Sequence, residues 1–323
     1  MSAFVPPELG VSYPDRLYIA GKWTPVASDH RLALVNPADE LEYARVAAAG
    51  PEEVDAAVAA ARKAFDGGPW PRLAPERRAE AIRALAAAVR RRGAQLDACW
   101  TRQVGIPVRI SAGSSAATAD RLDYYAALAE SYPCEDLRAT SGPASSVAVV
   151  VREAVGVVAA IAPWNGPLGS LLIKLAPALA AGCTVILKPS PETPLEAFLL
   201  AEAADEAGLP PGVINLLPAG SEASDLLVRH PGVDKVAFTG STGVGLHIAQ
   251  VCASRMARYT MELGGKSAAI VLDDYAPDAF GPAIAPLVTL LCGQVCINYS
   301  RILVPRARMG EYVESLAAAM AAT

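Results

Sequence analysis

The chain has 323 residues, of which 53% are hydrophobic, and its formal net charge is −5 at pH 7. This length and composition are sufficient for two domains with a sizeable core. The acidic balance argues against a nucleic-acid partner, because phosphate binding requires a basic surface. The six cysteines lack the paired spacing of a zinc ribbon, and residues 1–16 show no basic segment followed by an apolar run. Both features favour a reduced, cytoplasmic setting.

Two uncharged stretches, residues 154–173 and 279–300, are long enough to span a membrane. Each is interrupted by prolines, glycines and polar residues, among them Asn165 and Gln294, which a spanning helix rarely carries. We therefore expect both stretches to form buried strands and helices of an α/β protein, with no membrane partner.

The first 135 or so residues begin with an expected hairpin over 15–23 and continue as helices. One helix is expected to begin at Pro51 and a longer one at Pro75, because apolar residues then recur at helical spacing. Around residues 140–152 the composition changes from Ser, Gly and Pro to alternating Val, which predicts a β-hairpin or a long edge strand. An exposed edge of this kind is often covered by a partner subunit.

From Val155 onwards the pattern alternates regularly between strand and helix. The predicted strands are 157–162, 184–187, 213–217 and 235–239, and the helices that follow them are 168–181, 195–207, 224–229 and 242–254. Short apolar strands separated by helices predict a parallel sheet that is covered on both faces. Ligands bind at the carboxyl ends of such strands, where 163–165, Lys188 and 239–241 lie.

Cys296, which follows Gly-Gln-Val, and Glu262, which precedes Leu-Gly-Gly, form a candidate catalytic pair. A soft thiol nucleophile and a carboxylate base can together run acyl chemistry on a carbonyl group. Neither residue is persuasive alone, because a lone cysteine is more often part of a core and a lone glutamate is usually solvated. Cys292 could share a metal with Cys296, but no histidine lies near either residue. We expect Cys292 to fill the core and no metal to bind.

Two further motifs stand at predicted strand ends. The turn Gly240-Ser241-Thr242-Gly243-Val244-Gly245 opens a predicted helix, so its N–H groups could meet a pyrophosphate. Its spacing differs from the usual dinucleotide fingerprint, and glycines at a strand end often form only a turn. Asn165, in Ala-Pro-Trp-Asn-Gly-Pro, offers an amide donor for an oxyanion, although an Asn in a proline-rich turn ordinarily serves the turn itself.

The four motifs, which stand along the chain at Asn165, Gly240–Gly245, Glu262 and Cys296, resemble those of the aldehyde dehydrogenase superfamily. The resemblance runs from about Arg16 to the last residue. It implies an α/β fold with a Rossmann-like parallel-sheet cofactor domain, an incomplete α/β catalytic domain and a β-hairpin oligomerisation element. The implied boundaries are 1–135 and 155–263 for the dinucleotide-binding domain, 136–154 for the bridging hairpin and 264–323 for the catalytic domain. Family members continue further, through a Glu-x-Phe-Gly-Pro motif and a closing strand, so we expect the chain to be truncated at its C-terminus.

The resemblance also implies a reaction, the NAD(P)-dependent oxidation of a small-molecule aldehyde to a carboxylic acid. Cys296 would attack the aldehyde, and the oxyanion would accept hydrogen bonds from Asn165 and the Cys296 backbone. Glu262 would then activate the water that hydrolyses the thioester, with a pKa raised towards neutrality by desolvation. Lys174 matches a family lysine near this site, where it would serve either in a proton relay or in a structural ion pair. A homo-oligomer is expected for the family.

The resemblance places the cofactor contacts at the strand ends and the glycine turn: Ile161, Ala162, Pro163, Trp164, Lys188, Ser190, Pro191, Gly220, Phe238, Thr239, Gly240, Ser241, Val244, Leu263 and Gly264. Lys188 would bond the adenosine ribose, and a solvated lysine is the alternative. In the NAD-preferring pattern a Glu stands three residues after this lysine. Here that position is Pro191, and Glu192 is displaced by one, so the expected cofactor is NAD or NADP. Two other functions stay open: a silent fragment that binds a dinucleotide or a partner, and a cofactor-independent thiol esterase that uses Cys296 and Glu262.

Overall fold

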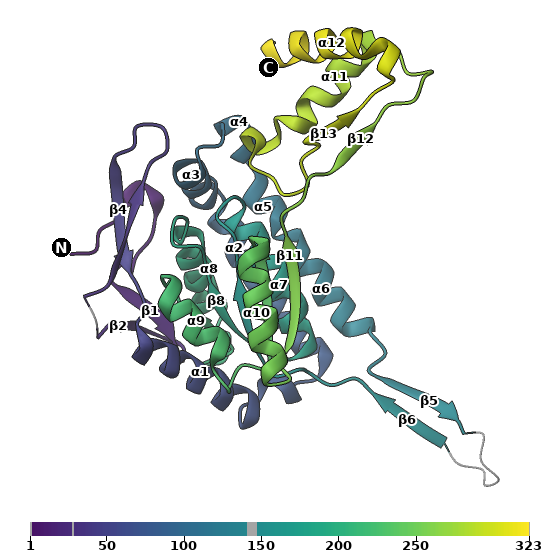
Figure 1. The fold of residues 1–323 in the computed structure, drawn as a ribbon. Helices are drawn as coiled ribbons and strands as arrows, with labels where there is room; N and C mark the ends of the chain where they lie inside the picture. The colour runs from purple at the N-terminus through teal and green to yellow at the C-terminus, as the bar shows by residue number, and fades with distance from the viewer. Residues whose placement is uncertain (1, 28, 141–146, 323) are drawn as a thin grey trace. The chain divides into compact units, whose positions relative to one another are not determined.

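The computed structural model describes residues 2–27, 29–140 and 147–322. The chain divides into two compact units (Figure 1). The first unit comprises Met1–Thr239 and Gly243–Met261, and the second comprises Gly240–Thr242 and Glu262–Thr323. None of the helices within the described residues is both long and apolar enough to cross a membrane.

The N-terminal part of the first unit contains two antiparallel strand pairs followed by helices. The pairs are β1 (Arg16–Ile19) with β2 (Lys22–Pro25) and β3 (Arg31–Val35) with β4 (Glu42–Ala47). The helices are α1 (Pro51–Asp66), α2 (Pro75–Arg91), α3 (Gly93–Val104), α4 (Val108–Ser111), α5 (Ser114–Thr118) and α6 (Asp120–Ser131). The predicted hairpin and the two predicted helix starts are confirmed. Proline opens α1 and α2 without cost, because the N–H that it lacks has no intrahelical partner at that position.

A five-stranded sheet with the order β11-β10-β7-β8-β9 forms the centre of the first unit. Its strands are β7 (Val157–Ile161), β8 (Thr184–Lys188), β9 (Ile214–Leu216), β10 (Lys235–Gly240) and β11 (Arg258–Leu263). The helices between them are α7 (Pro167–Ala181), α8 (Leu195–Glu206), α9 (Ser221–Arg229) and α10 (Thr242–Ser254). The predicted alternation is confirmed, with ends that differ by up to a few residues.

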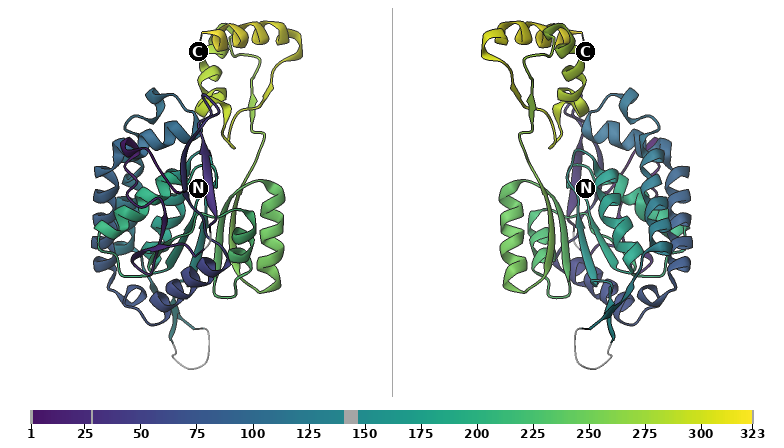
Figure 2. Two further views of the ribbon diagram at one scale, coloured as in Figure 1. Left: turned by 90° about the vertical axis from the view of Figure 1, so that its left-hand side faces the viewer. Right: turned by 90° about the vertical axis from the view of Figure 1, so that its right-hand side faces the viewer.

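Helices lie on both faces of this sheet, as Figure 2 shows. Helix α2 packs against α6, α7 and α8, and helix α1 packs against β8 and α9. Every residue of β7 and β8 is buried. Strands that are covered on both faces are expected to be continuously apolar, and this is why these segments showed no alternation of polar and apolar residues.

The sheet has a point at which its strand order reverses. From β7 the chain builds β8 and β9 on one side, and it then returns to place β10 on the other side of β7. The three strands β10, β7 and β8 are parallel, and their register aligns Phe238 with Ile161 and Ile161 with Lys188. The predicted convergence of these strand ends is therefore confirmed, at the position where α/β sheets bind ligands.

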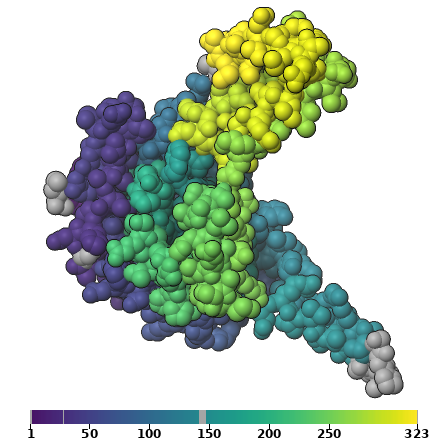
Figure 3. Space-filling view, viewed as in Figure 1, coloured from purple at the N-terminus to yellow at the C-terminus, as the bar shows by residue number. Residues whose placement is uncertain are grey.

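A hairpin of β5 (Glu135–Ala139) and β6 (Val147–Val151) projects from the first unit (Figures 1 and 3). Its strands are antiparallel, with Glu135 opposite Val151 and Ala139 opposite Val147. Of the two predicted alternatives the hairpin is correct, but its first strand precedes residue 140. Charged residues interrupt the apolar pattern of this strand, so only the family resemblance, with its hairpin at 136–154, covered it. The predicted segment at 141–146 lies outside the described residues.

The second unit is small and has its own core. Its elements are β12 (Ala268–Ile270), α11 (Pro277–Val288), β13 (Arg301–Leu303), α12 (Met309–Ala321) and the short 3-10 turns η3 (Leu290–Gly293) and η4 (Arg306–Arg308). The parallel strands β12 and β13 pair, and Phe280, Ile284 and Tyr312 form the core between α11 and α12. A Cβ at Gly281 would lie 2.2 Å from the carbonyl oxygen of Ser315, so only glycine permits this close helix contact.

Candidate functional site

Within the second unit the structure brings the segment after Glu262 against the segment that carries Cys296. A Cβ built on Gly265 would lie 3.5 Å from the carbonyl oxygen of Cys296. The two segments then continue into the paired strands β12 and β13, and Arg301 donates from its backbone N to Ser267 O at 3.2 Å and from Nε to Lys266 O at 2.8 Å. The sequence-predicted nucleophile and base therefore lie on adjacent segments.

The cysteines differ in accessibility. Cys99, Cys183 and Cys252 are buried, whereas Cys134, Cys292 and Cys296 are exposed. Burial raises the pKa of the Cys99 and Cys183 thiols, which makes these two sulfurs poor nucleophiles. Cys296 thus has the accessibility that a nucleophile needs.

The expectation that Cys292 fills the core is wrong. Its side chain is exposed, and its backbone is left-handed, with φ 58°. Leu291 and Gly293 also have positive φ, at 48° and 78°. This sharp turn lies outside the core of the second unit, so the cysteine has no apolar surroundings to fill. Left-handed non-glycine residues are uncommon and gather at functional sites, which is compatible with a turn that shapes the segment before Cys296.

The expectation that Glu262 is desolvated is also wrong for this structure. The residue is exposed on β11, which is the edge strand of the sheet. An edge strand has a neighbour on one side only, so its side chains keep more contact with solvent. Its neighbours Leu263 and Gly264, both predicted cofactor contacts, are half-buried and exposed respectively.

Asn165 stands in the turn between β7 and α7. The preceding Ile161 and Ala162 are buried, Pro163 is half-buried and Trp164 is exposed. The Ala162 N–H donates to the Lys188 carbonyl at 3.0 Å, so the start of the turn is tied to the end of β8. The Asn165 carbonyl accepts a hydrogen bond of 3.0 Å from the indole Nε1 of Trp100.

Lys174 is buried on α7 and links that helix to the end of β10. Its ammonium donates to the Thr239 hydroxyl at 2.6 Å and to the Ser170 carbonyl at 3.2 Å. These two contacts are with neutral groups. They fix the end of β10 relative to α7, next to the turn that carries Asn165.

Lys188 is buried at the end of β8, so the alternative of a solvated lysine is wrong. Burial lowers the pKa of its ammonium to about 8, and the nearby Glu192 carboxylate opposes this shift. The Ser190 hydroxyl donates to Glu192. Glu192 is exposed and Pro191 is half-buried, so a carboxylate lies beside Lys188 although the expected position holds a proline.

The glycine turn has the predicted placement. Strand β10 ends at Gly240 and α10 begins at Thr242, while Phe238 is buried and Thr239 is half-buried. Within α10, Gly243 and Val244 are exposed, and a Cβ on Gly243 would meet nothing within 4 Å. Gly220, at the N-cap of α9, has equally open space around it. Two helix starts at the carboxyl side of the sheet are thus accessible to a ligand.

Comparison with known proteins is consistent with these strand ends and motifs. The model of the aldehyde dehydrogenase family matches residues 23–323. The chain belongs to the aldehyde dehydrogenase family. It is 45% identical over 307 residues to the geranial dehydrogenase of Castellaniella defragrans, which covers 95% of this chain and 64% of that protein.

Two solved aldehyde dehydrogenases have closely similar folds. The Mycobacterium tuberculosis enzyme in complex with NAD+ superimposes with a TM-score of 0.90 and 38% identity, over 95% of this chain and 63% of that one. A mutant of aldehyde dehydrogenase C from Pseudomonas syringae, complexed with NAD+ and octanal, gives 0.88 and 36%, over 100% of this chain and 64% of that one. The chain therefore spans somewhat less than two thirds of these relatives.

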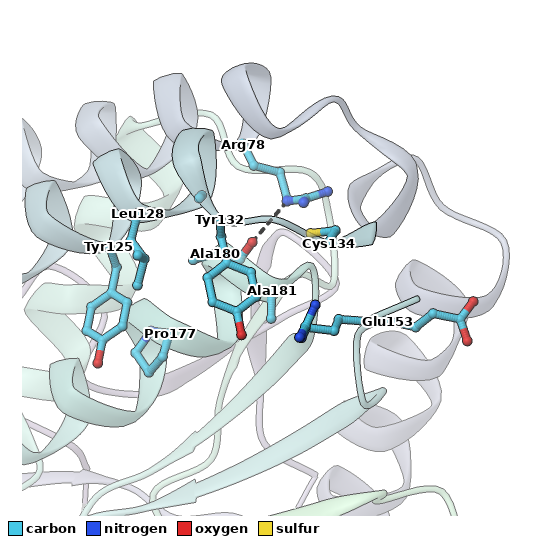
Figure 4. Close-up of a pocket in the computed structure, with 11 residues that line it drawn as sticks. Arg78, Tyr125, Leu128, Tyr132, Cys134, Glu153, Pro177, Ala180 and Ala181 are labelled. Carbon is cyan, nitrogen blue, oxygen red and sulfur yellow. Dashed lines mark hydrogen bonds between the residues drawn. The ribbon is translucent and has the colours of Figure 1, made fainter. Parts of the chain in front are cut away.

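The chain also has a cavity of about 260 Å³ at the base of the β5–β6 hairpin. Figure 4 shows its wall, where the Arg78 guanidinium donates to the Ala180 carbonyl at the end of α7. The remaining lining comes mainly from α6, α7 and the hairpin base: Tyr125, Leu128, Ala129, Tyr132, Cys134, Arg152, Glu153, Pro177 and Ala181. None of the sequence-predicted site residues lines this cavity.

Two residues near Asn165 were missed by the sequence analysis. Trp100 on α3 binds the Asn165 carbonyl, and Glu196 on α8 accepts a hydrogen bond from Leu168 N at 3.4 Å. No local motif announces either contact, because each partner is distant in the sequence. The only available signals were the presence of a tryptophan and a glutamate in predicted helical segments. Residues of these types occur in helices for many structural reasons, so they do not point to a site.

Proposed function

We propose that this chain supplies the cofactor-binding domain and the nucleophile-bearing part of an NAD(P)-dependent aldehyde dehydrogenase. The observation that supports the proposal most strongly is the exposed thiol of Cys296. The Cys296 segment lies against Gly265, which closely follows Glu262 in the sequence. Family membership and the folds of the two NAD+ complexes support it. We assign the first unit to the cofactor and the second to the start of the catalytic domain.

The proposed chemistry begins at Cys296. Its thiolate attacks the aldehyde carbon, and the carbonyl oxygen becomes an oxyanion that accepts hydrogen bonds from the Asn165 amide and the Cys296 N–H. NAD(P)+, held by Lys188 and the first turn of α10, would supply the acceptor for the hydride of this carbon. The resulting thioester on Cys296 is hydrolysed by a water molecule whose proton Glu262 removes. The balance is one aldehyde, one NAD(P)+ and one water converted to a carboxylic acid, NAD(P)H and a proton.

The residues of the first unit fit a dinucleotide. Lys188 is a buried cation at a strand end, beside the point where the strand order reverses. A ribose hydroxyl is a suitable acceptor for such an ammonium, and α10 has 13 residues and an accessible first turn for a pyrophosphate. Gly220 and Gly243 leave room for the ligand to approach the backbone.

We further propose that NADP is accepted as well as NAD. The position three residues after Lys188 is a proline, and the carboxylate of the displaced Glu192 is exposed and accepts a hydrogen bond from the Ser190 hydroxyl. We expect the dissociation constants for the two dinucleotides to agree within about tenfold, or about 1.4 kcal/mol. A titration that gives a thousandfold preference for NAD would assign the discriminating role to Glu192.

The β5–β6 hairpin supports assembly into a homo-oligomer. Leu137, Val147 and Val149 are 70%, 64% and 54% exposed, although their side chains are apolar. Apolar residues on a projecting two-stranded ribbon are unfavourable in water unless another surface covers them. A second copy of the same chain is the proposed cover.

The test is aldehyde-dependent formation of NADH or NADPH, with octanal and geranial as substrates. We expect turnover in the wild-type protein and none in Cys296→Ser. Hydrolysis of an activated ester without cofactor, in the absence of aldehyde oxidation, would instead identify a thiol esterase. A protein with neither activity that still binds NAD+ would be a binding component.

A further inference from the structure

The turn that carries Asn165 is held by side chains from helices that are far away in the sequence. Its carbonyl accepts from Trp100 Nε1 on α3 at 3.0 Å, across 65 residues of sequence. Gly169, at the start of α7, accepts from Arg121 on α6 at 3.1 Å. The carbonyl of Asn165 and the first turn of α7 that follows it are thus fixed by partners outside the turn.

The start of α7 needs such help because of its own sequence. Its N-cap is Gly166, which has no side chain to accept a hydrogen bond from the first turn. Unpaired N–H groups at a helix start are costly when they are buried. The buried carboxyl of Glu196 accepts from Leu168 N at 3.4 Å and so replaces the missing cap.

Helix α3 connects these two supports. Gln103 lies one turn after Trp100, and its amide donates to Glu196 at 3.3 Å and accepts from Leu195 N at 2.8 Å. One helix therefore binds the Asn165 carbonyl directly and the Glu196 cap indirectly. The buried network leaves the turn little freedom to shift.

The indole of Trp100 differs from two others in the protein. Within the described residues, Nε1 of Trp23 and Nε1 of Trp70 have no hydrogen-bond partner. The indole N–H of Trp100 is directed at the one backbone carbonyl that belongs to the candidate oxyanion donor. Packing alone would not require a donor at this position.

We propose that Trp100 is a positioning residue for the oxidation of aldehydes: its indole N–H holds the Asn165 backbone so that the side-chain amide keeps its catalytic orientation. The inference rests on the proposed function. An oxyanion donor acts through its geometry, and misplacement of about 1 Å can cost about 100-fold in rate. A hydrogen bond to the backbone of the donor residue restricts displacements of this kind.

The experiment compares Trp100→Phe, Asn165→Ala and the double variant in the 323-residue chain. We expect Trp100→Phe to lower kcat about tenfold with an unchanged KM for octanal, because an interaction made only in the transition state is lost. In the Asn165→Ala background the same substitution should have no further effect, since the group that it positions is absent. Additive losses, or no loss in the single variant, would overturn the proposal.

Hydrogen exchange supplies a readout that does not depend on activity. The backbone amides of residues 164–170 should exchange faster in Trp100→Phe than in the wild type, and unchanged exchange would also overturn the proposal. The matched control is Trp23→Phe, which removes the buried indole N–H of a half-buried side chain, and this N–H makes no hydrogen bond among the described residues. It should alter neither kcat nor exchange at 164–170.

If Trp100→Phe fails to fold, replacement of Trp100 by 3-benzothienylalanine keeps the ring shape and removes only the N–H donor, and the same outcomes apply. An inactive wild-type protein would refute the proposed oxidation of aldehydes. The exchange comparison would then still decide whether Trp100 holds the turn.

Discussion

At the scale of single residues, the most unusual group is the Glu196 carboxyl. It is buried, and burial raises its pKa from an ordinary value of 4.5 to about 8. Two donors, Leu168 N and the Gln103 amide, lie within hydrogen-bond distance of it, but its environment contains too little solvent to stabilise the charge. The carboxyl is therefore mainly protonated at neutral pH.

This shift predicts a pH-dependent stability. Between pH 5 and 8 the folded protein holds a proton that the unfolded chain has lost, so the free energy of unfolding falls as the pH rises, by about 1.4 kcal/mol per pH unit. The stabilisation is complete below the unfolded pKa and is lost as the pH passes 8. Glu196→Gln cannot ionise and should lack this contribution. Urea denaturation of both proteins at pH 6 and pH 8 measures the difference. An equal change in the free energy of unfolding between the two pH values in both proteins would count against the assignment.

Lys188 predicts a second pH effect, on cofactor binding. Burial lowers the pKa of its ammonium to about 8, so the charged donor is present below this pH and lost above it. If the ammonium binds the ribose, the affinity for NAD+ should fall about tenfold between pH 7 and pH 9, following the charged fraction. Lys188→Met should bind more weakly and with little dependence on pH. Calorimetric titration at both values checks this, and a flat profile in the wild type would remove Lys188 from the site.

At the scale of secondary structure elements, the β5–β6 hairpin and the paired helices α11 and α12 contrast. The helices bury Phe280, Ile284 and Tyr312 against each other, and the ring centroids of Phe280 and Tyr312 are 5.3 Å apart in an edge arrangement. The hairpin instead exposes its apolar residues on a ribbon of two strands. Such a ribbon is marginally stable by itself.

The hairpin predicts a specific effect on assembly. Replacing Val147 and Val149 by Thr keeps the β-branched shape but lowers the apolar area that a second copy would cover. We expect the double variant to dissociate at a concentration at least tenfold higher than the wild type, with the same circular dichroism spectrum. Sedimentation velocity over a concentration series measures this. A wild-type protein that is monomeric throughout the series would contradict a role in assembly.

The elements also show why sequence patterns succeeded or failed. The sheet could be predicted because buried parallel strands are short apolar runs, and glycine or proline separates them from helices. Strand β5 has no local signal, because its sequence, Glu-Asp-Leu-Arg-Ala, carries charges on an exposed ribbon and lacks an apolar face; the family resemblance alone placed residues 136–139 in the hairpin. Cys292 was misplaced because a left-handed turn over Leu291 and Cys292 has no signature in residues that usually avoid it.

At the scale of the whole molecule, the candidate site was predictable only as a set of strand-end motifs. Cys296, Glu262, Asn165 and Lys188 follow from local patterns joined with a family resemblance. Trp100 and Glu196 make contacts between α3, the turn before α7, and α8. These segments are distant in the sequence, and no local pattern indicates which of them pack against each other. The exposure of Glu262 depends on the position of β11 at the sheet edge, which a list of strands does not supply.

In the proposed reaction Cys296 forms an acyl intermediate during oxidation of an aldehyde. The most direct measurement uses Glu262→Gln, in which hydrolysis of the thioester is slowed, mixed with octanal and NAD+ and analysed by mass spectrometry. We expect a burst of NADH and an octanoyl adduct on the peptide that contains Cys296. NADH formation with no adduct, or an adduct on Cys134 or Cys292 in place of Cys296, would contradict it.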